Sequence, residues 1–588
     1  MDVSRERLAI VLVLPLCAFA ATARDACKQS VVDVPVTMES TQPVVMAKIN
    51  GVDARFIADS GAWWSVISPA AQAQYKLRSE FFPGFLRMQG VGGSTGAGIA
   101  RVDAFGLFGA TFKNIQFIVA GGDVGAGAAG VLGQNVLRLL GNVEYDLAHG
   151  VLRLVRVVDC DHADLAYWVK AGDSYSQMEI ESATGRDART IGTAYVNGVR
   201  VRALFDTGAS LSTLTLAAAK RAGVTPDSPG VVESTSIRGL GHHIERTWIA
   251  PVDSFKIGDE TIQHTKLRIG DIGDDIEMLV GADFFLSHRV YVANNQKRLY
   301  STYNGGPVFN LEGLPSAASS TGVEVSDEPG DAAGYSRRGM ARAGRNDFDH
   351  ALADLNRACE LAPAEATYFY QRGQIRARHN EPKLALADID QALKLKPDYV
   401  DALYMHAQFS FAGGDRDTAR RDLDAADAHA PPEADLRIMM ARAYERANWL
   451  DSAIAQYDAW INYHEADARW PQALAGRCWD RALVGQALSA ALDDCNTALK
   501  NAQPGSEMSI VVLESRGLVR LRLGDFTKAA ADYDAALKIK PRNAWALYGR
   551  GVVKLRLKQQ PAGQTDIDAS VALAPKIADD YKKFGIVP

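Results

Sequence analysis

Residues 50–62 read NGVDARFIADSGA, and residues 197–209 read NGVRVRALFDTGA. Each stretch holds an Asn-Gly turn, a short apolar strand, and an aspartate that opens a tight glycine loop. The two aspartates, Asp59 and Asp206, are 147 residues apart. The duplication predicts two similar halves that can bring Asp59 and Asp206 face to face.

Two more landmarks follow each aspartate in the same order. A glycine-rich turn comes first, at residues 90–93 in the first half and 239–242 in the second. Two aliphatic residues and a glycine come next, and the glycines, Gly133 and Gly281, stand 74 and 75 residues after their aspartates. A chance match of three residues does not explain why three landmarks occur in the same order in both halves. We therefore expect one fold that is present in two copies.

Residues 31–302 resemble a retropepsin-like aspartic protease whose two halves are fused in one chain, as in pepsin-like enzymes. The resemblance rests on the order Asp-Ser/Thr-Gly, glycine-rich turn, and aliphatic-aliphatic-Gly. It implies a mainly β, bilobal fold with lobe 1 at residues 31–158 and lobe 2 at residues 176–302. It also implies that Gly92 and Gly241 lie in hairpin flaps that close over a substrate.

The resemblance implies an aspartic endopeptidase that acts on a peptide or protein substrate, with Asp59 and Asp206 as its catalytic pair. Two carboxyl groups about 3 Å apart cannot both ionise, so the pair shares one proton. The ionised partner can deprotonate a water molecule that attacks a peptide carbonyl, and the protonated partner can donate to the leaving nitrogen. This chemistry calls for no cofactor and no metal ion.

Five residues are expected to support this pair. Gly61 and Gly208 have no Cβ, which lets backbone amides approach the carboxylates. The resemblance implies that the hydroxyls of Ser60 and Thr207 form hydrogen bonds across the pseudo-twofold axis. It also implies that Ser210 supports the second carboxylate from outside.

The first half departs from the family pattern at Trp63-Trp64, where Ser or Thr is usual and the second half has Ser210. These tryptophans either pack as wall or core residues or line the substrate cleft. The departure keeps an alternative function open, in which a degenerate protease fold is a non-catalytic scaffold that binds peptides. A third interpretation pairs each lobe with its copy in another chain, and the matched duplication favours pairing within one chain.

A 34-residue period runs through the second half of the chain. Pro363, Pro397 and Pro431 keep this spacing, and so do Pro541 and Pro575. A unit of this length, with small residues at fixed positions and a closing proline, resembles the tetratricopeptide repeat (TPR).

The resemblance implies an all-α solenoid over residues 335–580, joined to the protease lobes by a flexible linker at residues 303–334. About seven units are expected, beginning near residues 332, 366, 400, 434, 472, 510 and 544. The register shifts around Trp470-Pro471. Such solenoids bind protein partners on a concave face, and a spacer without a ligand is the alternative.

The first residues have the features of a secretory signal. Charged residues at positions 5–7 precede an apolar run over residues 8–21, and Ala21-Thr22-Ala23 offers a cleavage site. We expect residues 1–23 to be removed and the mature protein to be periplasmic or secreted. The apolar run is too short for an ordinary spanning helix, so no stable membrane anchor is expected after cleavage.

Five cysteines remain after this cleavage. In an oxidising compartment Cys27 could pair with Cys160, and Cys478 could pair with Cys495. Cys359 is then left over, and we interpret it as a small buried hydrophobic residue.

Other patterns are interpreted as structural. A net charge of −6 over 588 residues, with no dense basic patch, argues against nucleic-acid binding. Residues 90–96 lack the Lys-Ser/Thr of a phosphate loop, and His242-His243 lack ligands at metal-binding spacing. The repeated Asp-x-Asp pairs on the second helices of the repeats are interpreted as a solvated face.

Overall fold

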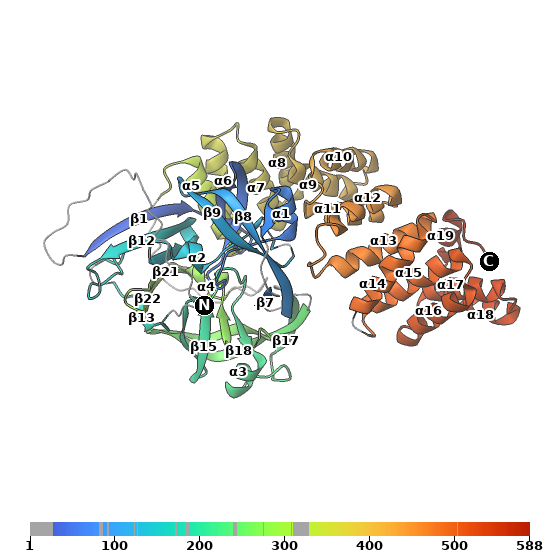
Figure 1. Ribbon diagram of the computed structural model, residues 1–588, viewed down its shortest axis with the longest axis horizontal. Helices are drawn as coiled ribbons and strands as arrows, with labels where there is room; N and C mark the ends of the chain where they lie inside the picture. Colours follow the sequence, from blue (N-terminus) through green and yellow to red (C-terminus); the bar gives the residue numbers. More distant parts are fainter. Residues whose placement is uncertain are drawn as a thin grey trace.

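The computed structural model describes residues 27–80, 86–90, 93–122, 124–125, 127–170, 173–182, 188–238, 244–273, 276–306, 308–309, 328–502 and 504–588. Two β lobes come first along the chain, and a helical solenoid follows and extends away from them (Figure 1). The predicted fold class, a mainly β bilobal module followed by an all-α solenoid, is confirmed. None of the described helices is long and apolar enough to cross a bilayer.

Lobe 1 is a curled sheet in the order β2-β3-β4-β10-β5-β9-β8-β6, with β7 paired to β8 and a further pairing of β3 with β8. Its strands are β2 (Thr37–Glu39), β3 (Gln42–Ile49), β4 (Val52–Ala58), β5 (Val66–Ile67), β6 (Arg78–Glu80), β7 (Leu86–Gly90), β8 (Gly93–Leu107), β9 (Ala110–Val119) and β10 (Gly130–Leu132). Two short helices, α1 (Pro69–Gln74) and α2 (Gln134–Leu137), complete the lobe.

Lobe 2 repeats this arrangement in the order β14-β15-β20-β16-β19-β18-β17, again with a closing pair, β14 with β18. Its strands are β14 (Ile191–Val196), β15 (Val199–Phe205), β16 (Thr213–Thr215), β17 (Val232–Arg238), β18 (Ile244–Ile257), β19 (Glu260–Gly270) and β20 (Met278–Val280). Its helices are α3 (Leu216–Arg221) and α4 (Ala282–Ser287). The duplicated sequence thus folds as a duplicated sheet.

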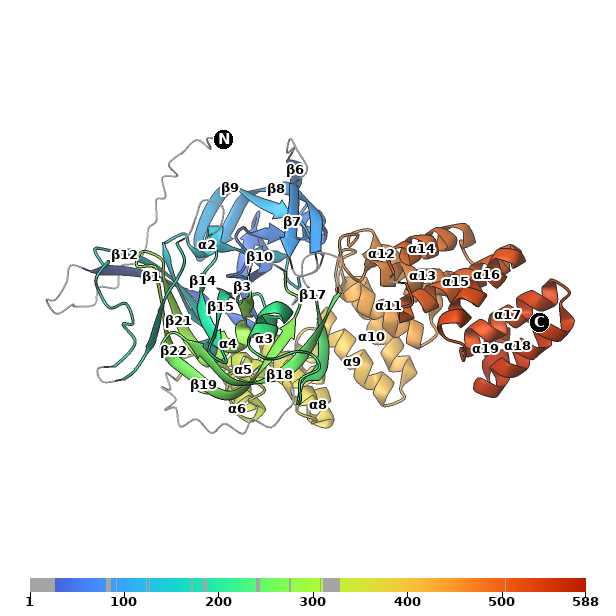
Figure 2. The ribbon, with the colours of Figure 1, turned by 90° about the horizontal axis from the view of Figure 1, so that it is seen from below.

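A six-stranded sheet joins the lobes, in the order β1-β12-β11-β21-β22-β13. Its strands are β1 (Lys28–Pro35), β11 (Asn142–Asp146), β12 (Val151–Val158), β13 (Ser176–Glu179), β21 (His288–Ala293) and β22 (Arg298–Tyr303), and the 3-10 helix η1 (Leu147–His149) follows β11. Strand β11 from the first half pairs antiparallel with β21 from the second, with Tyr145 opposite Val290. Figure 2 shows the lobes stacked one over the other, with the solenoid running off to one side.

Over residues 328–502 and 504–588 the solenoid consists of seven helix pairs and a last short helix. The pairs are α5 (Ala332–Gly344) with α6 (Phe348–Leu361), α7 (Ala366–Arg378) with α8 (Pro382–Leu395), α9 (Val400–Ala412) with α10 (Arg416–His429), α11 (Leu436–Arg446) with α12 (Leu450–Ile461), α13 (Trp470–Val484) with α14 (Leu488–Asn501), α15 (Glu507–Leu523) with α16 (Phe526–Ile539), and α17 (Ala544–Arg556) with α18 (Gln560–Leu573). Helix α19 (Ile577–Lys583) closes the array. Ala351, Ala385 and Ala419, which recur every 34 residues, are fully buried, as close helix packing requires.

The interpretation of the Asp-x-Asp pairs as a solvated face was right for the second residue, since Asp390 and Asp534 are exposed, and wrong for the first. At the first position of this pattern, in five of the repeats, a buried aspartate binds two cations from the first helix of its own repeat, as Asp354 does with Arg338 and Arg342 at 2.7 and 2.9 Å. The same arrangement joins Arg372 and Arg376 to Asp388, Arg477 and Arg481 to Asp494, Arg516 and Arg520 to Asp532, and Arg550 and Lys554 to Asp566. We call this series the Arg–Asp ladder.

The ladder also ties neighbouring repeats together. Arg372 donates to Asn356 of the repeat before it at 2.9 Å, and Arg550 reaches Asp534 in the same way at 2.8 Å. In the third repeat a histidine, His406, takes the place of the arginine. A sequence pattern that resembled free surface charge is therefore part of the packing between helices.

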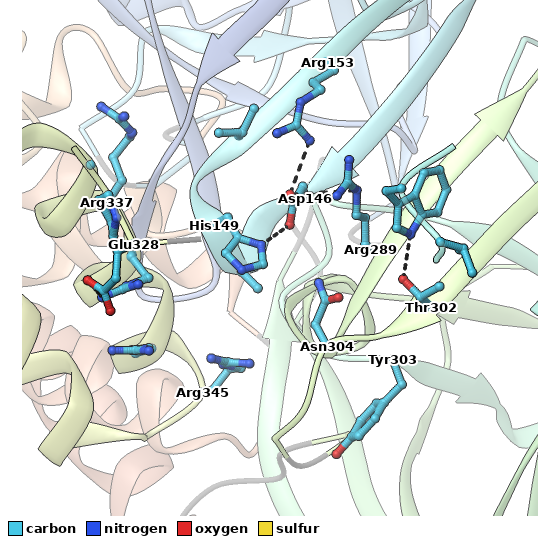
Figure 3. Close-up of a pocket in the computed structure, with 18 of the residues that line it drawn as sticks. Asp146, His149, Arg153, Arg289, Thr302, Tyr303, Asn304, Glu328, Arg337 and Arg345 are labelled. Carbon is cyan, nitrogen blue, oxygen red and sulfur yellow. Dashed lines mark hydrogen bonds and ion pairs between the residues drawn. The ribbon is translucent and has the colours of Figure 1, made fainter. Parts of the chain in front are cut away.

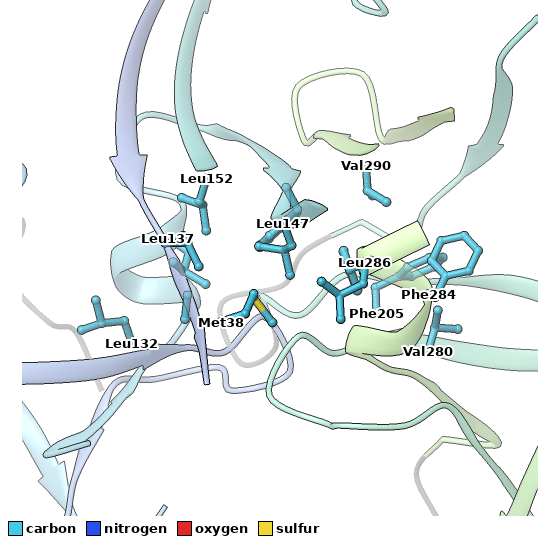
Figure 4. Packing of buried hydrophobic residues seen from close by; sticks show 14 of the residues in the cluster. Met38, Leu132, Leu137, Leu147, Leu152, Phe205, Val280, Phe284, Leu286 and Val290 are labelled. Carbon is cyan, nitrogen blue, oxygen red and sulfur yellow. The ribbon is translucent and has the colours of Figure 1, made fainter. Parts of the chain in front are cut away.

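One hydrophobic core runs through both lobes and into the first repeat. Met38, Leu147 and Leu286 meet where lobe 1, the six-stranded sheet and helix α4 come together (Figure 4). Met340 of α5 and Leu355 of α6 belong to the same cluster. The first repeat is therefore packed against the lobes, and α5 begins at Ala332, close to the predicted end of the linker. The domain boundaries themselves stay a prediction, since residues 310–327 lie outside the described residues.

Both predicted disulfides are confirmed. Cys27 is bonded to Cys160 and ties β1 to the end of β12, while Cys478 and Cys495 join α13 to α14. Within the described part of the chain Cys359 is the free cysteine, and it is buried, as expected. The predicted signal segment, residues 1–23, lies outside the described residues.

Candidate active site

Two loops meet at the centre of the bilobal module, one at the end of β4 and one at the end of β15. Asp59 follows β4, and its amide donates to Leu132 O of the parallel strand β10 at 3.0 Å. Asp206 follows β15, and its amide donates to Val280 O of β20 at 2.9 Å. The apolar strands before the two aspartates and the aliphatic pairs before Gly133 and Gly281 are thus neighbours that fix each carboxylate at a strand end.

The two loops are joined by hydrogen bonds that cross from one lobe to the other. The Ser60 hydroxyl donates to Phe205 O at 2.8 Å and accepts from the Thr207 amide at 2.9 Å. The Thr207 hydroxyl donates to Ala58 O at 2.6 Å and accepts from the Ser60 amide at 3.0 Å. Ser60 and Thr207 are both buried, so these four bonds, the crossed loop bonds, are shielded from water.

Backbone amides hold each carboxylate from its own loop. The amides of Gly61 and Ala62 donate to Asp59 Oδ1 at 2.9 and 2.8 Å. In lobe 2 the amides of residues 208 and 209 donate to Asp206 Oδ1 at 2.9 and 3.2 Å. Each carboxyl group is thus held by two amides of its own loop.

The glycines show that the two carboxyl groups face each other. A Cβ on Gly61 would lie 2.3 Å from Asp206 Cγ, and a Cβ on Gly208 would lie 2.5 Å from Asp59 Cγ. Each glycine therefore lies directly against the carboxyl group of the opposite lobe. Glycine is required at both positions because any side chain would push the pair apart.

The surroundings favour a protonated pair. Burial, together with the charge of the facing Asp206, raises the pKa of Asp59 well above its ordinary value, against the opposing effect of the Ala62 amide. Burial also raises the pKa of Asp206, although its hydrogen bonds with Asp59 and with the Gly208 amide act in the opposite direction. The two carboxyls share a hydrogen bond, so their proton belongs to the pair.

Sequence reasoning missed a second pair of hydroxyls, six residues after each aspartate. In lobe 1 the amide and hydroxyl of Ser65 both donate to Asn135 Oδ1, at 2.7 and 2.8 Å, and the Gly133 amide donates to the Ser65 hydroxyl at 3.0 Å. In lobe 2 Ser212 bonds in the same way to Asp283, with its hydroxyl 2.7 Å from Asp283 Oδ1.

These bonds join each aspartate loop to the start of the helix that follows the neighbouring strand, α2 in lobe 1 and α4 in lobe 2. The signal was present in the sequence, because Ser65 and Ser212 stand at equal distances from their aspartates. Asn135 and Asp283 likewise stand two residues after their glycines. A comparison of the two halves that continued two residues past Gly133 and Gly281 would have included Asn135 and Asp283.

Ser210 does not support its carboxylate in the way that the resemblance implied. It is exposed, and it takes part in no hydrogen bond with the described residues. The hydroxyl that holds the loop is that of Ser212 instead. Trp63 stands in lobe 1 at the position that Ser210 holds in lobe 2, and Ser210 makes no such bond. The crossed loop bonds of lobe 1 are complete although lobe 1 has no serine at this position.

The two tryptophans of lobe 1 have different surroundings. Trp63 is 43% exposed, and its ring centroid lies 5.6 Å from that of Trp64. Trp64 is half-buried and packs in a small cluster with Met88 and Ala97, which stand on the hairpin of β7 and β8. Trp64 is thus a packing residue at the base of this hairpin, and Trp63 is open to solvent.

The two predicted flaps correspond to the hairpins β7–β8 and β17–β18. Their tips, which contain Gly92, Gly241 and His242-His243, lie outside the described residues. The roles of Gly92 and Gly241 as flap residues therefore stay predictions. Among the described residues no group of three or more His, Cys, Asp or Glu side chains is arranged to hold a metal ion.

A large cavity lies away from the aspartate pair, at the seam between the six-stranded sheet and α5. Its volume is about 980 Å³, and Asp146, His149, Arg289 and Arg345 are among its walls (Figure 3). Asp146 accepts from His149 at 2.6 Å, and Arg345 donates to Leu286 O at 3.3 Å. Neither Asp59 nor Asp206 lines this cavity, so it is a feature of the docking between lobes and solenoid.

Comparisons with known proteins agree with this geometry. Residues 45–136 and 192–284 match the aspartyl protease family, and residues 517–558 match the TPR repeat. The chain thus carries an aspartyl protease domain in two repeats and a TPR repeat near its C-terminus. No curated protein matches the chain.

Three solved structures illustrate the similarity, each at low identity. The C-terminal part of a TPR repeat-containing protein from Cytophaga hutchinsonii is 16% identical, with a TM-score of 0.29, over 37% of this chain and 87% of that one. PilW, a type IV pilus biogenesis factor, is 16% identical, with a TM-score of 0.29, over 37% of this chain and 97% of that one. The Cut9–Hcn1 hetero-tetramer of the APC/C is 15% identical, with a TM-score of 0.27, and the chain covers 42% of its length.

Proposed function

We propose that the chain is an aspartic endopeptidase in which Asp59 and Asp206 activate a water molecule between them. The most direct support is that each loop glycine lies against the carboxyl group of the opposite lobe. A Cβ on Gly61 would be 2.3 Å from Asp206 Cγ, and a Cβ on Gly208 would be 2.5 Å from Asp59 Cγ. Two buried carboxyls in that arrangement hold one proton between them, so that the pair carries a single negative charge in sum.

The proposed reaction needs no group beyond this pair and water. The ionised carboxylate takes a proton from the water molecule, and the water oxygen forms a bond to the peptide carbonyl carbon. The protonated carboxyl donates to the carbonyl oxygen as its charge develops. When the carbon–nitrogen bond breaks, the pair gives one proton to the leaving nitrogen and takes one back from a hydroxyl of the tetrahedral intermediate as the new carboxyl group forms, so the pair returns to its starting state.

The alternative is a non-catalytic scaffold that binds peptides. Its motivation in the sequence was Trp63, and the structure weakens that motivation because Ser210 makes no hydrogen bond to the described residues. Each aspartate loop makes the same four hydrogen bonds, so the eight bonds of the two loops are matched between the lobes. The endopeptidase is therefore the better proposal.

The solenoid extends the proposal to protein partners. TPR repeats support a role in protein–protein interaction, and we place the partner on the concave face. We also propose that the protein is exported and is periplasmic or secreted after removal of residues 1–23. Two disulfides support an oxidising compartment.

The test is a digest of a denatured protein mixture across acid to neutral pH, read by mass spectrometry. The full-length protein should generate new peptide termini, and a folded Asp206→Asn variant should not. If the wild-type protein captures peptides but leaves them intact at every pH, the scaffold replaces the endopeptidase.

A further inference from the structure

The solenoid lies against lobe 1 at positions that flank the strand of Asp59. Helix α5 approaches the turn between β2 and β3 so closely that a Cβ on Gly344 would lie 2.5 Å from Ser40 O. The first-repeat residues Met340 and Ala343 share a core with Met38 of β2. This contact anchors the first repeat on lobe 1.

A second contact reaches β4 itself, four residues before Asp59. Arg55 on β4 donates to Glu39 Oε1 at 2.9 Å. Asp401, in the first turn of α9, is exposed, and Arg55 and Lys396 are the cations whose charges act on it. Asp401 in turn adds to the rise that burial causes in the pKa of Glu39. Arg55 thus forms an ion pair with an acid of lobe 1 and interacts electrostatically with an acid of the third repeat.

A third contact comes from the place where the repeat register shifts. The segment between α12 and α13 contains Asp467, which is buried, and it lies against Gly122, which follows β9. A Cβ on Gly122 would lie 2.6 Å from Asp467 Cα. The irregular spacing of the fourth and fifth units therefore supplies a loop that touches lobe 1.

The segment after Gly122 leads directly to the first aspartate loop. Val124 O accepts from Gln42 Nε2 at 2.9 Å, and the Ala129 amide donates to Arg55 O at 2.8 Å. The segment then forms β10, whose Leu132 O accepts from the Asp59 amide. The second and third contacts thus bear on the two parallel strands that place Asp59.

We propose that the docked solenoid positions the lobe 1 half of the active site, so that cleavage of even a short peptide depends on the contacts of α9 and the α12–α13 segment. This inference rests on the proposed endopeptidase activity. It assigns Arg55, Gly122 and Asp467 as positioning residues, which act on Asp59 through β4 and β10.

The first test compares two full-length variants that each add one methyl group. Gly122→Ala places a Cβ against the backbone of Asp467, whereas Gly413→Ala adds the same group to an exposed position whose nearest atom is 3.5 Å away. With a peptide of six to eight residues as substrate, Gly122→Ala should lower kcat about tenfold or more, with little change in KM and a displaced pH profile. Gly413→Ala should stay within about twofold of the wild type.

A second pair changes charge at the other contact. Asp401→Lys sets a cation against Arg55 and should also lower kcat and move the pH profile, while Asp417→Lys, in the first turn of α10, should not. Circular dichroism shows whether each variant folds. Wild-type rates and pH profiles in both Gly122→Ala and Asp401→Lys would overturn the inference. A wild-type protein that cleaves no peptide would instead overturn the proposed function beneath it.

Discussion

Lobe 1 and lobe 2 share one strand order and one set of loop bonds, and they differ in what surrounds those bonds. The serine that locks each loop binds the neutral amide of Asn135 in lobe 1 and the carboxyl of Asp283 in lobe 2. The Ser60 hydroxyl also shares a hydrogen bond with Tyr145 of β11, a residue that is buried. The solenoid contacts described above fall on the β4 side of lobe 1.

The comparison shows which parts of a duplicated fold must stay alike. The crossed loop bonds are reciprocal, so a change in one lobe breaks bonds that serve the other. The outer supports serve one lobe each, and there the two copies have diverged. Four predictions test which residues must stay alike in the two lobes and which can differ.

The largest expected effect is at the aspartate pair. Asp59→Asn and Asp206→Asn should each lower kcat by about three orders of magnitude or more, because both the base and the acid are needed. Peptide cleavage measures the loss, and circular dichroism checks the fold, since Asn is close to Asp in shape. Substantial turnover in a folded Asp59→Asn variant would show that lobe 1 is not catalytic.

The crossed loop bonds come next. Ser60→Ala and Thr207→Ala each leave a buried carbonyl and a buried amide without a partner, so each should lower the free energy of unfolding by about 2–4 kcal/mol. Denaturant unfolding measures this loss. Ser60→Thr and Thr207→Ser keep the hydroxyls and are the controls, and a loss in one lobe alone would contradict the reciprocity of the bonds.

The third prediction separates the outer supports by pH. Burial raises the pKa of Asp283 to about 6 in the folded protein, above its ordinary value. The stability that this group contributes is full below its ordinary pKa, near 4, and is lost as the pH rises through 6. Asp283→Asn should therefore be more stable than the wild type by about 1–3 kcal/mol at neutral pH, with a flatter profile between pH 4 and 6.

Thermal unfolding at several pH values measures this difference. The matched variant, Asn135→Asp, puts the same carboxyl into lobe 1 and should introduce the same pH dependence there. An Asp283→Asn variant that is less stable than the wild type at neutral pH would mean that the ionised carboxylate is needed by the Ser212 bonds.

The smallest effect is expected at Ser210 and Trp63, the position at which lobe 1 departs from the family pattern. Ser210→Ala removes a hydroxyl that makes no hydrogen bond to the described residues, so kcat should stay within about twofold. Trp63→Ser should also keep kcat, because Trp63 is 43% exposed and apart from the crossed loop bonds. A rise in KM alone for Trp63→Ser would place this side chain in the substrate cleft.

The duplicated motif was enough to predict the bilobal fold and the residues of the two aspartate loops that meet between the lobes. The chemistry of Asp59, Asp206, Ser60 and Thr207 is local to a few positions and is repeated, so it can be read from spacing. The role given to Ser210 could not be judged in this way, because a hydroxyl one turn away from a carboxylate need not point at it.

The docking of the solenoid could not be predicted from the sequence. The contact of Gly122 with Asp467 joins segments that are far apart in the chain, and neither has a distinctive pattern. The Arg–Asp ladder was misjudged for a related reason. A charged pair on an amphipathic helix resembles a solvated face until the cations of the neighbouring helix are placed beside it.

The ladder also has a mechanical consequence. Its rungs link each repeat to the one before it, as Arg372 links to Asn356 and Arg550 to Asp534, so neighbouring repeats cannot twist apart without breaking an ion pair or a hydrogen bond. A solenoid braced in this way transmits a load along its length instead of absorbing it between units. A force on the last repeats is therefore transmitted along the solenoid to α9 and the α12–α13 segment, where the solenoid meets lobe 1.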